Sequence, residues 1–564
     1  MKKGSKELKS HPHLLLREHI DQVRLAISSI LKRHPPWAVC RVTQKILDFV
    51  AFYHDIGKST TFFQKYIDNP SQYVGNSADK AHSALSMFLA LVIAKEQQWE
   101  GQDALAAAAV ICGHHSRLPT FPKYRLGEVE NVRYTIDRFA SGSNVSVILK
   151  QLQSIDFAML GSGLGIPFEK MGSFKDINRN SVTVIRDIQG YLHKKLIKEN
   201  RNLDLGDAIA FRFKCQLIYS ILLEADKALL AVSNPSIYFK HSSKKWDSEW
   251  VEKYIGKKDE TDVNSMRRQI REEVKENISR KADSFLFNII APTGSGKTLL
   301  AATWALKLRE ATAPNFYSKV IIVLPFLSII DQTVNDYKKL LGVGSIKPEG
   351  GWLLASHSLA DRVYDSELPE GTNSFLVDTW RSDIIITTYD QFLYSLMDPR
   401  ARYQMRFHNL CDALIIMDEV QSLPCKLWQP LSELFRQLAE MGKSKLLLMS
   451  ATLPPFVSGT EPLLAEPKHI FAKCKRYCLR LRLDTPISLN ELCDELEERL
   501  HDWVKKKKRV LLTFNTRKSA RKIRDYIADW IRGNGQLGEI PLYFISADVT
   551  PKDRLGFIEL IKKG

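Results

Sequence analysis

Histidine and aspartate residues that could bind metal ions are concentrated in the first 226 residues of the sequence. The segment HDIGK places an imidazole, His54, directly before a carboxylate, Asp55. An aspartate can bridge two cations while a histidine fills one coordination position. Lys58 in the same segment would either stabilise developing negative charge or face solvent. Further candidates, each of which could instead be an ordinary helix, cap or salt-bridge residue, are His19, His82, His114, His115 and Asp226.

A second group of residues is typical of a nucleotide site. The segment APTGSGKT, residues 291–298, follows the apolar run FLFNII and precedes a helical pattern. Its glycines allow a tight loop whose N–H groups face phosphate oxygens, while its lysine adds charge and its last threonine offers a hydroxyl to Mg²⁺. The ATP-binding residues predicted here are Thr293, Gly294, Ser295, Gly296, Lys297 and Thr298.

Two later segments would complete the nucleotide site. MDEVQ follows an apolar run, so Asp418 is expected at a strand end, where it can hold Mg²⁺ through water. The next residue, Glu419, can polarise the attacking water as a catalytic group. SATLP follows the run KLLLM, and the hydroxyls of Ser450 and Thr452 are placed to couple the ATP site to a second lobe. Without the phosphate loop, the acidic pair alone would be interpreted as an ordinary loop.

The elements that must position these residues change in character along the chain. From about residue 14 to 233, apolar residues recur at helical spacing, whereas after Ser284 short apolar runs alternate with helical patterns. Such alternation predicts a parallel sheet covered by helices on both faces. We expect an all-α domain over 1–240, a linker and lead-in helix over 241–280, an α/β lobe over 281–475 and part of a second over 476–564, with strands at 509–514 and 541–546.

Composition narrows the class of protein. The formal net charge of +17 favours a polyanionic partner such as nucleic acid, although a basic surface can also serve solubility alone. The eight cysteines include one close pair, Cys474 and Cys478, without the second pair or nearby histidine of a zinc site, which indicates reduced thiols in a cytoplasmic protein. No signal peptide and no membrane-spanning run are recognised.

The segments APTGSGKT, MDEVQ and SATLP resemble the signature motifs of superfamily 2 helicases, which implies lobes of the RecA-like fold. Two further segments, VLPFLSIIDQT and TTYDQF, lie where such helicases touch the nucleic-acid backbone. Hydroxyl and amide groups at strand ends suit phosphate contact without base readout, although each segment alone could be a simple loop. The DNA-binding residues implied by this resemblance are Pro325, Ser328, Thr387, Thr388 and Gln391.

The histidine set resembles that of the HD superfamily of metal-dependent phosphohydrolases. The resemblance implies catalytic roles for Asp55 and Lys58 and two divalent cations bridged by Asp55. A mixed imidazole and carboxylate set suits Fe²⁺, Mn²⁺, Ni²⁺ or Co²⁺ better than a structural zinc. One cation would be held by His19, His54, Asp55 and Asp226, and the second by Asp55, His82, His114 and His115.

The two halves together resemble the CRISPR-associated helicase–nucleases of type I interference, from His19 to the end of the chain. This resemblance rests on the sequences of five segments, LPFLSIIDQ, TTYDQF, DEVQ, SATLP and ISADVTPKDR. It implies recruitment by an RNA-guided surveillance complex to an R-loop, ATP-driven 3′–5′ movement on single-stranded DNA, and metal-dependent cleavage of that strand.

One expected part is not found before Gly564: the second-lobe arginine that reaches the γ-phosphate. We therefore expect a fragment, a truncated gene or one half of a split protein whose missing part comes from another chain, with weak ATP turnover by itself. Three other functions stay open. They are hydrolysis of small phosphate esters by the HD site, ATP-dependent RNA remodelling with a scaffold HD domain, and a non-catalytic remnant that only binds partners.

Overall fold

The computed structural model describes residues 7–34, 42–119, 145–166, 168, 172–197, 203–239, 246–257, 259–310, 318–346, 350–357, 363–452, 457–473, 480–481, 484–535 and 540–563. The close cysteine pair Cys474 and Cys478 lies outside these residues. The chain divides into two compact units, Met1–Cys474 and Lys475–Gly564. No helix among the described residues has the length and hydropathy needed to cross a bilayer.

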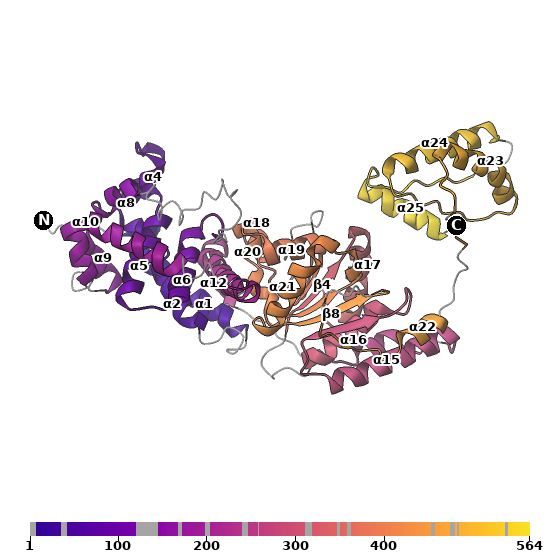
Figure 1. The fold of residues 1–564 in the computed structure, drawn as a ribbon, viewed down its shortest axis with the longest axis horizontal. Coiled ribbons are helices and arrows are strands. Elements are labelled where there is room, and N and C mark those ends of the chain that lie inside the picture. Colours follow the sequence, from indigo (N-terminus) through magenta and orange to yellow (C-terminus); the bar gives the residue numbers. More distant parts are fainter. Residues whose placement is uncertain are drawn as a thin grey trace. The chain divides into compact units, whose positions relative to one another are not determined.

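The first part of the larger unit is helical, as the helical spacing predicts (indigo to magenta in Figure 1). Helix α5 (Ser83–Glu96) is buried from Leu85 to Ala94, which is typical of a helix that is apolar on all sides. The other helices are α1 (Leu16–Lys32), α2 (Val42–Tyr53), α3 (Thr61–Asp68), α4 (Ser77–Lys80), α6 (Gly101–Gly113), α8 (Val145–Leu152), α9 (Phe157–Leu164), α10 (Gly172–Gly190), α12 (Leu205–Ala231) and α13 (Pro235–Phe239). A short hairpin, β1 (Lys9–His11) and β2 (Leu14–Leu15), precedes α1, and the turn η1 (Ile56–Ser59) follows α2.

The second part of the larger unit is built on a seven-stranded parallel sheet with the order β5-β6-β4-β7-β8-β3-β9. Its strands are β3 (Leu286–Ile290), β4 (Val320–Leu324), β5 (Leu353–Ser356), β6 (Ile384–Thr388), β7 (Leu414–Met417), β8 (Lys445–Ser450) and β9 (Glu461–Pro462). Strands β4 and β7 are buried along their whole length, as expected for parallel strands covered on both faces. The predicted fold class, a helical domain followed by an α/β lobe, is therefore confirmed.

Alternate residues of strands β4 to β8 belong to two different hydrophobic cores. Ile322 and Ile386 pack in one core with α14 (Trp250–Ile255), α15 (Asp262–Arg280), α16 (Lys297–Glu310) and α17 (Leu327–Val343). Ile321 and Ile385 pack in the other core with α18 (Glu370–Asp378), α19 (Tyr389–Met397) and α21 (Trp428–Glu440), and that core continues into α12 and the rest of the helical domain. The helical domain thus shares its hydrophobic core with one face of the sheet.

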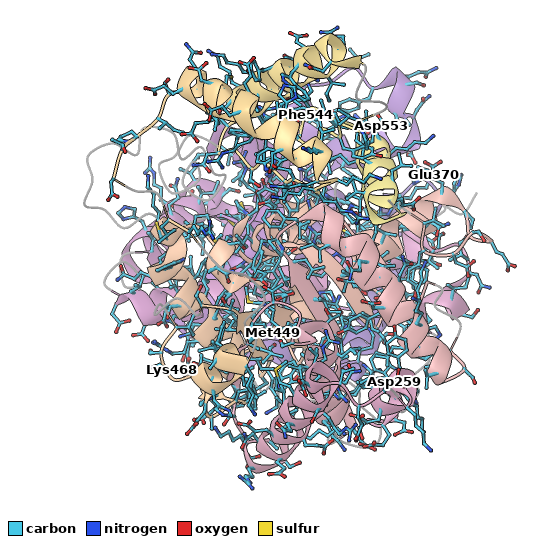
Figure 2. The ribbon with its side chains drawn as sticks, turned by 90° about the vertical axis from the view of Figure 1, so that its right-hand side faces the viewer. Asp259, Glu370, Met449, Lys468, Phe544 and Asp553 are labelled. Carbon is cyan, nitrogen blue, oxygen red and sulfur yellow. The ribbon has the colours of Figure 1, made fainter. Side chains whose placement is uncertain are left out.

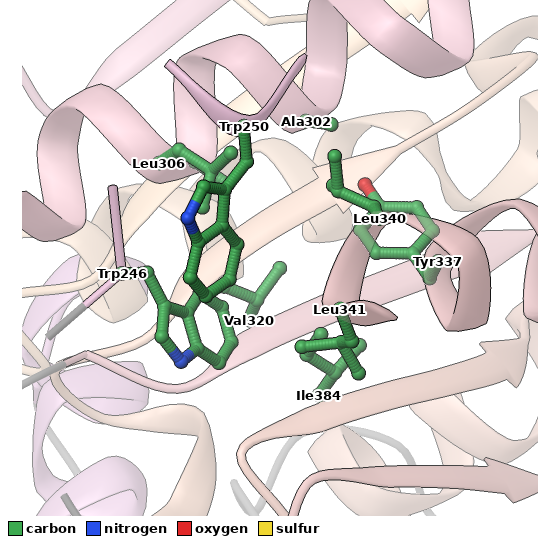
Figure 3. Close-up of a pocket in the computed structure, with 10 residues that line it drawn as sticks. Trp246, Trp250, Ala302, Leu306, Val320, Tyr337, Leu340, Leu341 and Ile384 are labelled. Atoms are coloured by element: carbon green, nitrogen blue, oxygen red, sulfur yellow. The ribbon is translucent and has the colours of Figure 1, made fainter. Parts of the chain in front are cut away.

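The segment between the two parts is held against the sheet lobe. Trp246 and Trp250 line a small apolar pocket together with Val320 and Ile384 (Figure 3), and the guanidinium of Arg309 lies 3.7 Å from the centre of the Trp246 ring. The predicted lead-in helix is α15. Figure 2 shows the contrast between Met449 of β8, which is buried, and Lys468 of α22 (Pro467–Lys473) at the periphery.

The smaller unit contains α23 (Leu489–Lys505), α24 (Arg517–Gly533) and α25 (Pro551–Lys563). The strands predicted at 509–514 and 541–546 are wrong, because both segments are described and neither has a strand. Leu511 in the first of these runs is 88% exposed, and no strand among the described residues of this unit lies beside it. Two strands without further partners are marginal in water.

A buried carboxylate near the sheet gives a pH-dependent prediction. Asp412 precedes β7, is 4% exposed, and has its pKa raised by burial to about 8. Its carboxylate contacts His34, whose Nδ1 lies 3.4 Å from Oδ2, but burial keeps the pKa of His34 well below its usual value, so this imidazole is neutral and does not offset the burial of Asp412. An unfolded aspartate ionises near pH 4, so folding must take up a proton between about pH 4 and pH 8. The free energy of unfolding therefore falls as the pH rises through this window.

Asp412→Asn is expected to stabilise the protein increasingly across that window. Asparagine does not titrate, and it tolerates the left-handed backbone found at this position, where φ is 55°. Melting temperatures of both proteins at about pH 5 and about pH 9 would check this. If the melting temperatures of the variant and the wild type differed by the same amount at both pH values, the raised pKa of Asp412 would be disproved.

Candidate metal centre and nucleotide site

Seven predicted metal-binding side chains are brought together from within α1 and α12 and from the ends of α2, α5 and α6. Asp55 stands where α2 turns into η1, and it is fully buried. Two groups of candidate ligand atoms, each within 4.8 Å of one another, share this aspartate. They are His19, His54, Asp55 and Asp226, named here the first cluster, and Asp55, His82, His114 and His115, named the second cluster. This is the same division into two sets that the sequence predicts.

Backbone hydrogen bonds orient two of the imidazoles. His54 Nδ1 lies 3.0 Å from the carbonyl oxygen of Ala51, and His114 Nδ1 lies 2.6 Å from that of Ile111. A carbonyl oxygen only accepts, so Nδ1 carries the proton and Nε2 keeps its lone pair. Each Nε2 is buried, lies 3.5 Å from an oxygen of Asp55, and makes no hydrogen bond. Such orphaned atoms facing one another fit a divalent cation.

The electrostatics of the clusters also suit cations. Burial opposes ionisation of Asp55, yet the ammonium of Lys58 holds the pKa of that carboxyl well below its usual range. Burial lowers the pKa of His82 to about 4 and of His115 to about 2, so both are neutral at neutral pH, as metal ligands must be. His19 differs, because Asp226 and Asp55 overcome its burial and raise its pKa to about 9. Binding a cation at the first cluster must therefore displace a proton from His19.

Lys58 does not face solvent. Lys58 is only 4% exposed, and its Nζ lies 2.6 Å from Oδ2 of Asp55. The alternative that Lys58 faces solvent is therefore wrong. Its position beside Asp55 is compatible with stabilising developing negative charge and also with a purely structural role, neutralising Asp55.

One histidine beside the centre was not predicted. His11 of β1 has its ring centre 5.0 Å from that of His19, and burial is the main cause that lowers its pKa to about 4. The hairpin is tied to the HDIGK turn by Gln64, which accepts from the N–H of Lys9 and donates to the carbonyl of Lys58. The close spacing of histidines in SHPH just before α1 was the only signal available in the sequence.

The phosphate loop joins β3 to α16. Gly294 and Gly296 have φ of 82° and 90°, a left-handed backbone that explains why glycine is needed at both positions. Arg267 of α15 donates to the carbonyl oxygen of Gly294 from Nε at 3.1 Å and Nη2 at 2.6 Å. The Ser295 hydroxyl is buried and makes no hydrogen bond. Thr293 precedes these residues, and α16 starts at Lys297 and Thr298, so the positive end of the helix dipole faces the loop.

The acidic pair follows β7 on the same edge of the sheet, where the carboxyl ends of parallel strands meet. Glu419 Oε1 lies 2.6 Å from Lys297 Nζ, so the loop and the acidic pair are in direct contact. Burial raises the pKa of Asp418, and the hydroxyl of Tyr389 donates to its backbone carbonyl. A lysine and two carboxylates are thus gathered at one end of α16.

The predicted coupling hydroxyls lie beside this site. Ser450 donates to Gln421, which follows the acidic pair, and accepts from the N–H of Thr452 at 3.0 Å. The N–H of Ala291, at the start of the phosphate loop, donates to the carbonyl of Ser450. One residue of β8 therefore contacts both segments that form the nucleotide site.

The predicted DNA-binding residues follow β4 and β6 at this same sheet edge. Thr387 is fully buried and donates to the carbonyl of Ser356. Thr388 caps α19 by accepting from the N–H of Gln391, whose side-chain oxygen accepts from Arg406. Pro325 comes directly after β4, and the side chain of Ser328 lies outside the described residues.

Two family models match the chain one after the other. The model described as Cas3, HD domain, matches residues 2–155, and the model described as DEAD/DEAH box helicase matches residues 268–458. The chain therefore joins a region similar to the Cas3 HD domain to a region similar to DEAD/DEAH box helicases. The HD match includes six of the seven candidate ligands, and Asp226 lies beyond it. The two domains imply a divalent-metal site and a nucleotide site.

Two curated proteins are similar to parts of the chain. The chain is 24% identical over 453 residues to a CRISPR-associated nuclease/helicase Cas3 from Haloferax volcanii, covering 74% of this chain and 46% of that protein. A protein named Lhr helicase/probable uracil glycosylase, from Mycolicibacterium smegmatis, is 25% identical over 253 residues, covering 42% of this chain and 16% of its own length.

Solved structures share the fold. The crystal structure of T. fusca Cas3-AMPPNP has a TM-score of 0.55 at 15% identity and covers 96% of this chain and 64% of that one. The structure of T. fusca Cas3-ADP gives the same TM-score at 14% identity, with coverages of 97% and 65%. The chain therefore spans less than two thirds of the length of these relatives.

Proposed function

We propose that the chain is a nuclease–helicase of type I CRISPR interference that acts in the cytoplasm on single-stranded DNA. Residues 1–240 form the nuclease domain and residues 281–475 the first motor lobe. The motor moves 3′ to 5′ on the displaced strand of an R-loop, to which an RNA-guided surveillance complex recruits it, and the HD site cuts that strand. The observation that carries this proposal is the pair of ligand clusters sharing Asp55 on a chain that also holds a phosphate loop.

The nuclease step rests on the two clusters. The first and second clusters would each hold one divalent cation, and their imidazoles favour Mn²⁺, Fe²⁺, Ni²⁺ or Co²⁺. Bound there, two such ions supply an activated water and stabilise the oxygens of a phosphodiester during in-line displacement. Lys58 adds a buried positive charge beside Asp55, where the phosphate would gain negative charge.

The motor step rests on the contact between the phosphate loop and the acidic pair. On ATP binding, Lys297 would leave Glu419 for the terminal phosphates, and Thr298 with Asp418 would hold Mg²⁺. Glu419 is then free to polarise the attacking water. Net charge of +17 supports a grip on the DNA backbone that does not depend on sequence.

The proposal is tested by offering four substrates to the full chain without ATP. With Mn²⁺ or Ni²⁺ present, labelled single-stranded DNA should be cut, and duplex DNA should be cut much more slowly. Single-stranded RNA and a small ester such as p-nitrophenyl phosphate are the other two arms. Faster turnover of the small ester than of DNA would favour a general phosphohydrolase, and preference for RNA would favour an RNA-processing factor.

A further inference from the structure

A fully buried carboxylate lies on the helix that carries one of the candidate metal ligands. Glu224 of α12 precedes Asp226 by two residues and has no exposed surface. Its oxygens lie 2.5 Å from Arg33 Nη2, 2.9 Å from the Tyr238 hydroxyl, 3.3 Å from Arg381 Nη1 and 3.1 Å from His408 Nε2. We name these five residues the Glu224 clamp. Arg381 and His408 belong to the helicase domain, whereas Arg33, Tyr238 and Glu224 precede it.

The clamp and the metal centre use opposite faces of α12. Residues two apart on an α-helix point about 200° away from each other. Asp226 accordingly faces His19 Nε2 at 3.1 Å, while Glu224 faces Arg381, which lies just before β6. One turn earlier on α12, the hydroxyl of Ser220 makes a second contact with His408. It accepts from the backbone N–H of His408 at 3.0 Å and lies 2.8 Å from Nδ1 of the His408 ring.

The clamp also holds the helix that carries His19. Arg33 directly follows α1, so its contact with Glu224 joins the end of α1 to α12. Arg381 donates in addition to the carbonyl oxygen of Tyr238, which ties α13 to the same point. Two of the four ligands of the first cluster, His19 and Asp226, therefore stand on helices that meet at Glu224.

Burying a carboxylate costs folding free energy unless the charge is paired. A paired carboxylate also fixes the geometry of its partners. Glu224 is paired in this way, because Arg33 Nη2 lies 2.5 Å and Arg381 Nη1 lies 3.3 Å from one of its oxygens. The charge is therefore present in the folded protein and holds both arginines in place. Removal of one partner would leave α12 free to turn or shift toward new partners.

We infer that Arg381 and His408 of the helicase domain are positioning residues for the nuclease, because they fix α1 and α12 and thereby hold His19 and Asp226 in the first cluster. This inference rests on the proposed metal function of the clusters. It makes the helicase domain a structural part of the metal centre, although neither residue touches a candidate ligand.

The second cluster offers an internal control. Its ligands are Asp55, His82, His114 and His115, none of which lies on α1 or α12. Loosening the clamp should weaken one cation site and spare the other. General destabilisation would weaken both.

The test is a Mn²⁺ titration of the full chain, followed by electron paramagnetic resonance. Wild type should bind two ions per chain. In Arg381→Gln and in His408→Gln, one site should weaken by about tenfold to about 100-fold, the usual effect of losing an outer-shell contact, while the other keeps its affinity. Arg381→Lys, which keeps the charge but not the planar fork, should fall between wild type and Arg381→Gln.

The matched control is Lys214→Met. Lys214 is also on α12 and forms a partly buried ion pair, but its partner is Asp103 of α6, within the HD domain. Both Mn²⁺ affinities should stay at the wild-type value in this variant. Binding of a fluorescent ATP analogue would show that the helicase domain of each variant is folded. If Arg381→Gln does not fold, His408→Gln alone provides the test.

Unchanged affinity at both sites in the folded clamp variants would overturn the inference, and so would an equal loss at both. A wild-type chain that binds no Mn²⁺ would instead end the proposed function itself. The two failures are therefore distinguishable in one titration.

Discussion

Asp55→Ala is expected to abolish metal-dependent cleavage of single-stranded DNA, with a loss on the order of 10³-fold or more. Asp55 is the residue shared by both clusters, so its removal takes one ligand from each cation at once. It also leaves Lys58 buried without the carboxylate that lies 2.6 Å from its Nζ. Cleavage of a labelled oligonucleotide in Mn²⁺, measured at saturating metal, checks this prediction.

The matched control for this variant is Asp48→Ala. Asp48 is on α2, two turns before Asp55, but its side chain is 70% exposed and belongs to neither cluster. It should cut DNA at the wild-type rate. Asp55→Asn, which keeps the shape but not the charge, should also be inactive if the carboxylate bridges cations. Cleavage at wild-type rate by a folded Asp55→Ala protein would disprove a role for this aspartate.

Lys297→Ala is expected to abolish ATP binding while leaving ATP-independent, metal-dependent cleavage intact. The lysine supplies the point charge for the terminal phosphates, and it is 8% exposed at the N-terminus of α16. A loss of at least about 100-fold in ATP affinity is expected from removing a buried charge-assisted contact. Titration with a fluorescent ATP analogue and a cleavage assay on the same preparation give the two readouts.

Lys307→Ala is the matched control for this second variant. Lys307 is on the same helix, two to three turns later, and its contact with Glu249 is 3.6 Å long and partly exposed. ATP affinity and cleavage should both match wild type. If Lys297→Ala also lost cleavage, the nucleotide site and the metal centre would not be independent, and the proposed division of labour would be wrong.

The candidate metal set could be predicted from the sequence because its chemistry is local and unusual. A His–Asp pair, an adjacent His–His pair and a carboxylate inside an apolar helix each stand out on their own. His11 could not be predicted, since its approach to His19 depends on how the β1–β2 hairpin folds back on α1.

The Glu224 clamp could not be predicted at all. Glu224 is separated from its partners by up to 191 positions, and arginine, histidine and glutamate side chains are usually solvated. Glu224 is completely buried because the helical domain packs against the sheet, and this packing cannot be read from the sequence.

The strands of the first lobe and those of the smaller unit show why pattern alone is insufficient. Runs such as KVIIVL and ALIIM became strands because neighbours on both sides supply their hydrogen bonds. The run RVLLTF has a similar composition, but the described part of the smaller unit offers it no strand as a neighbour, and Leu511 remains exposed. Strand formation depends on partners that a local pattern does not contain.

The most direct test of the metal centre is anomalous diffraction at the manganese edge from crystals of the full chain soaked in Mn²⁺. We expect two separate peaks, one within the first cluster and one within the second, with Asp55 contacting both. A map with no peak at these residues, or one in which His54, Asp55, His114 and Asp226 lie far apart, would contradict it.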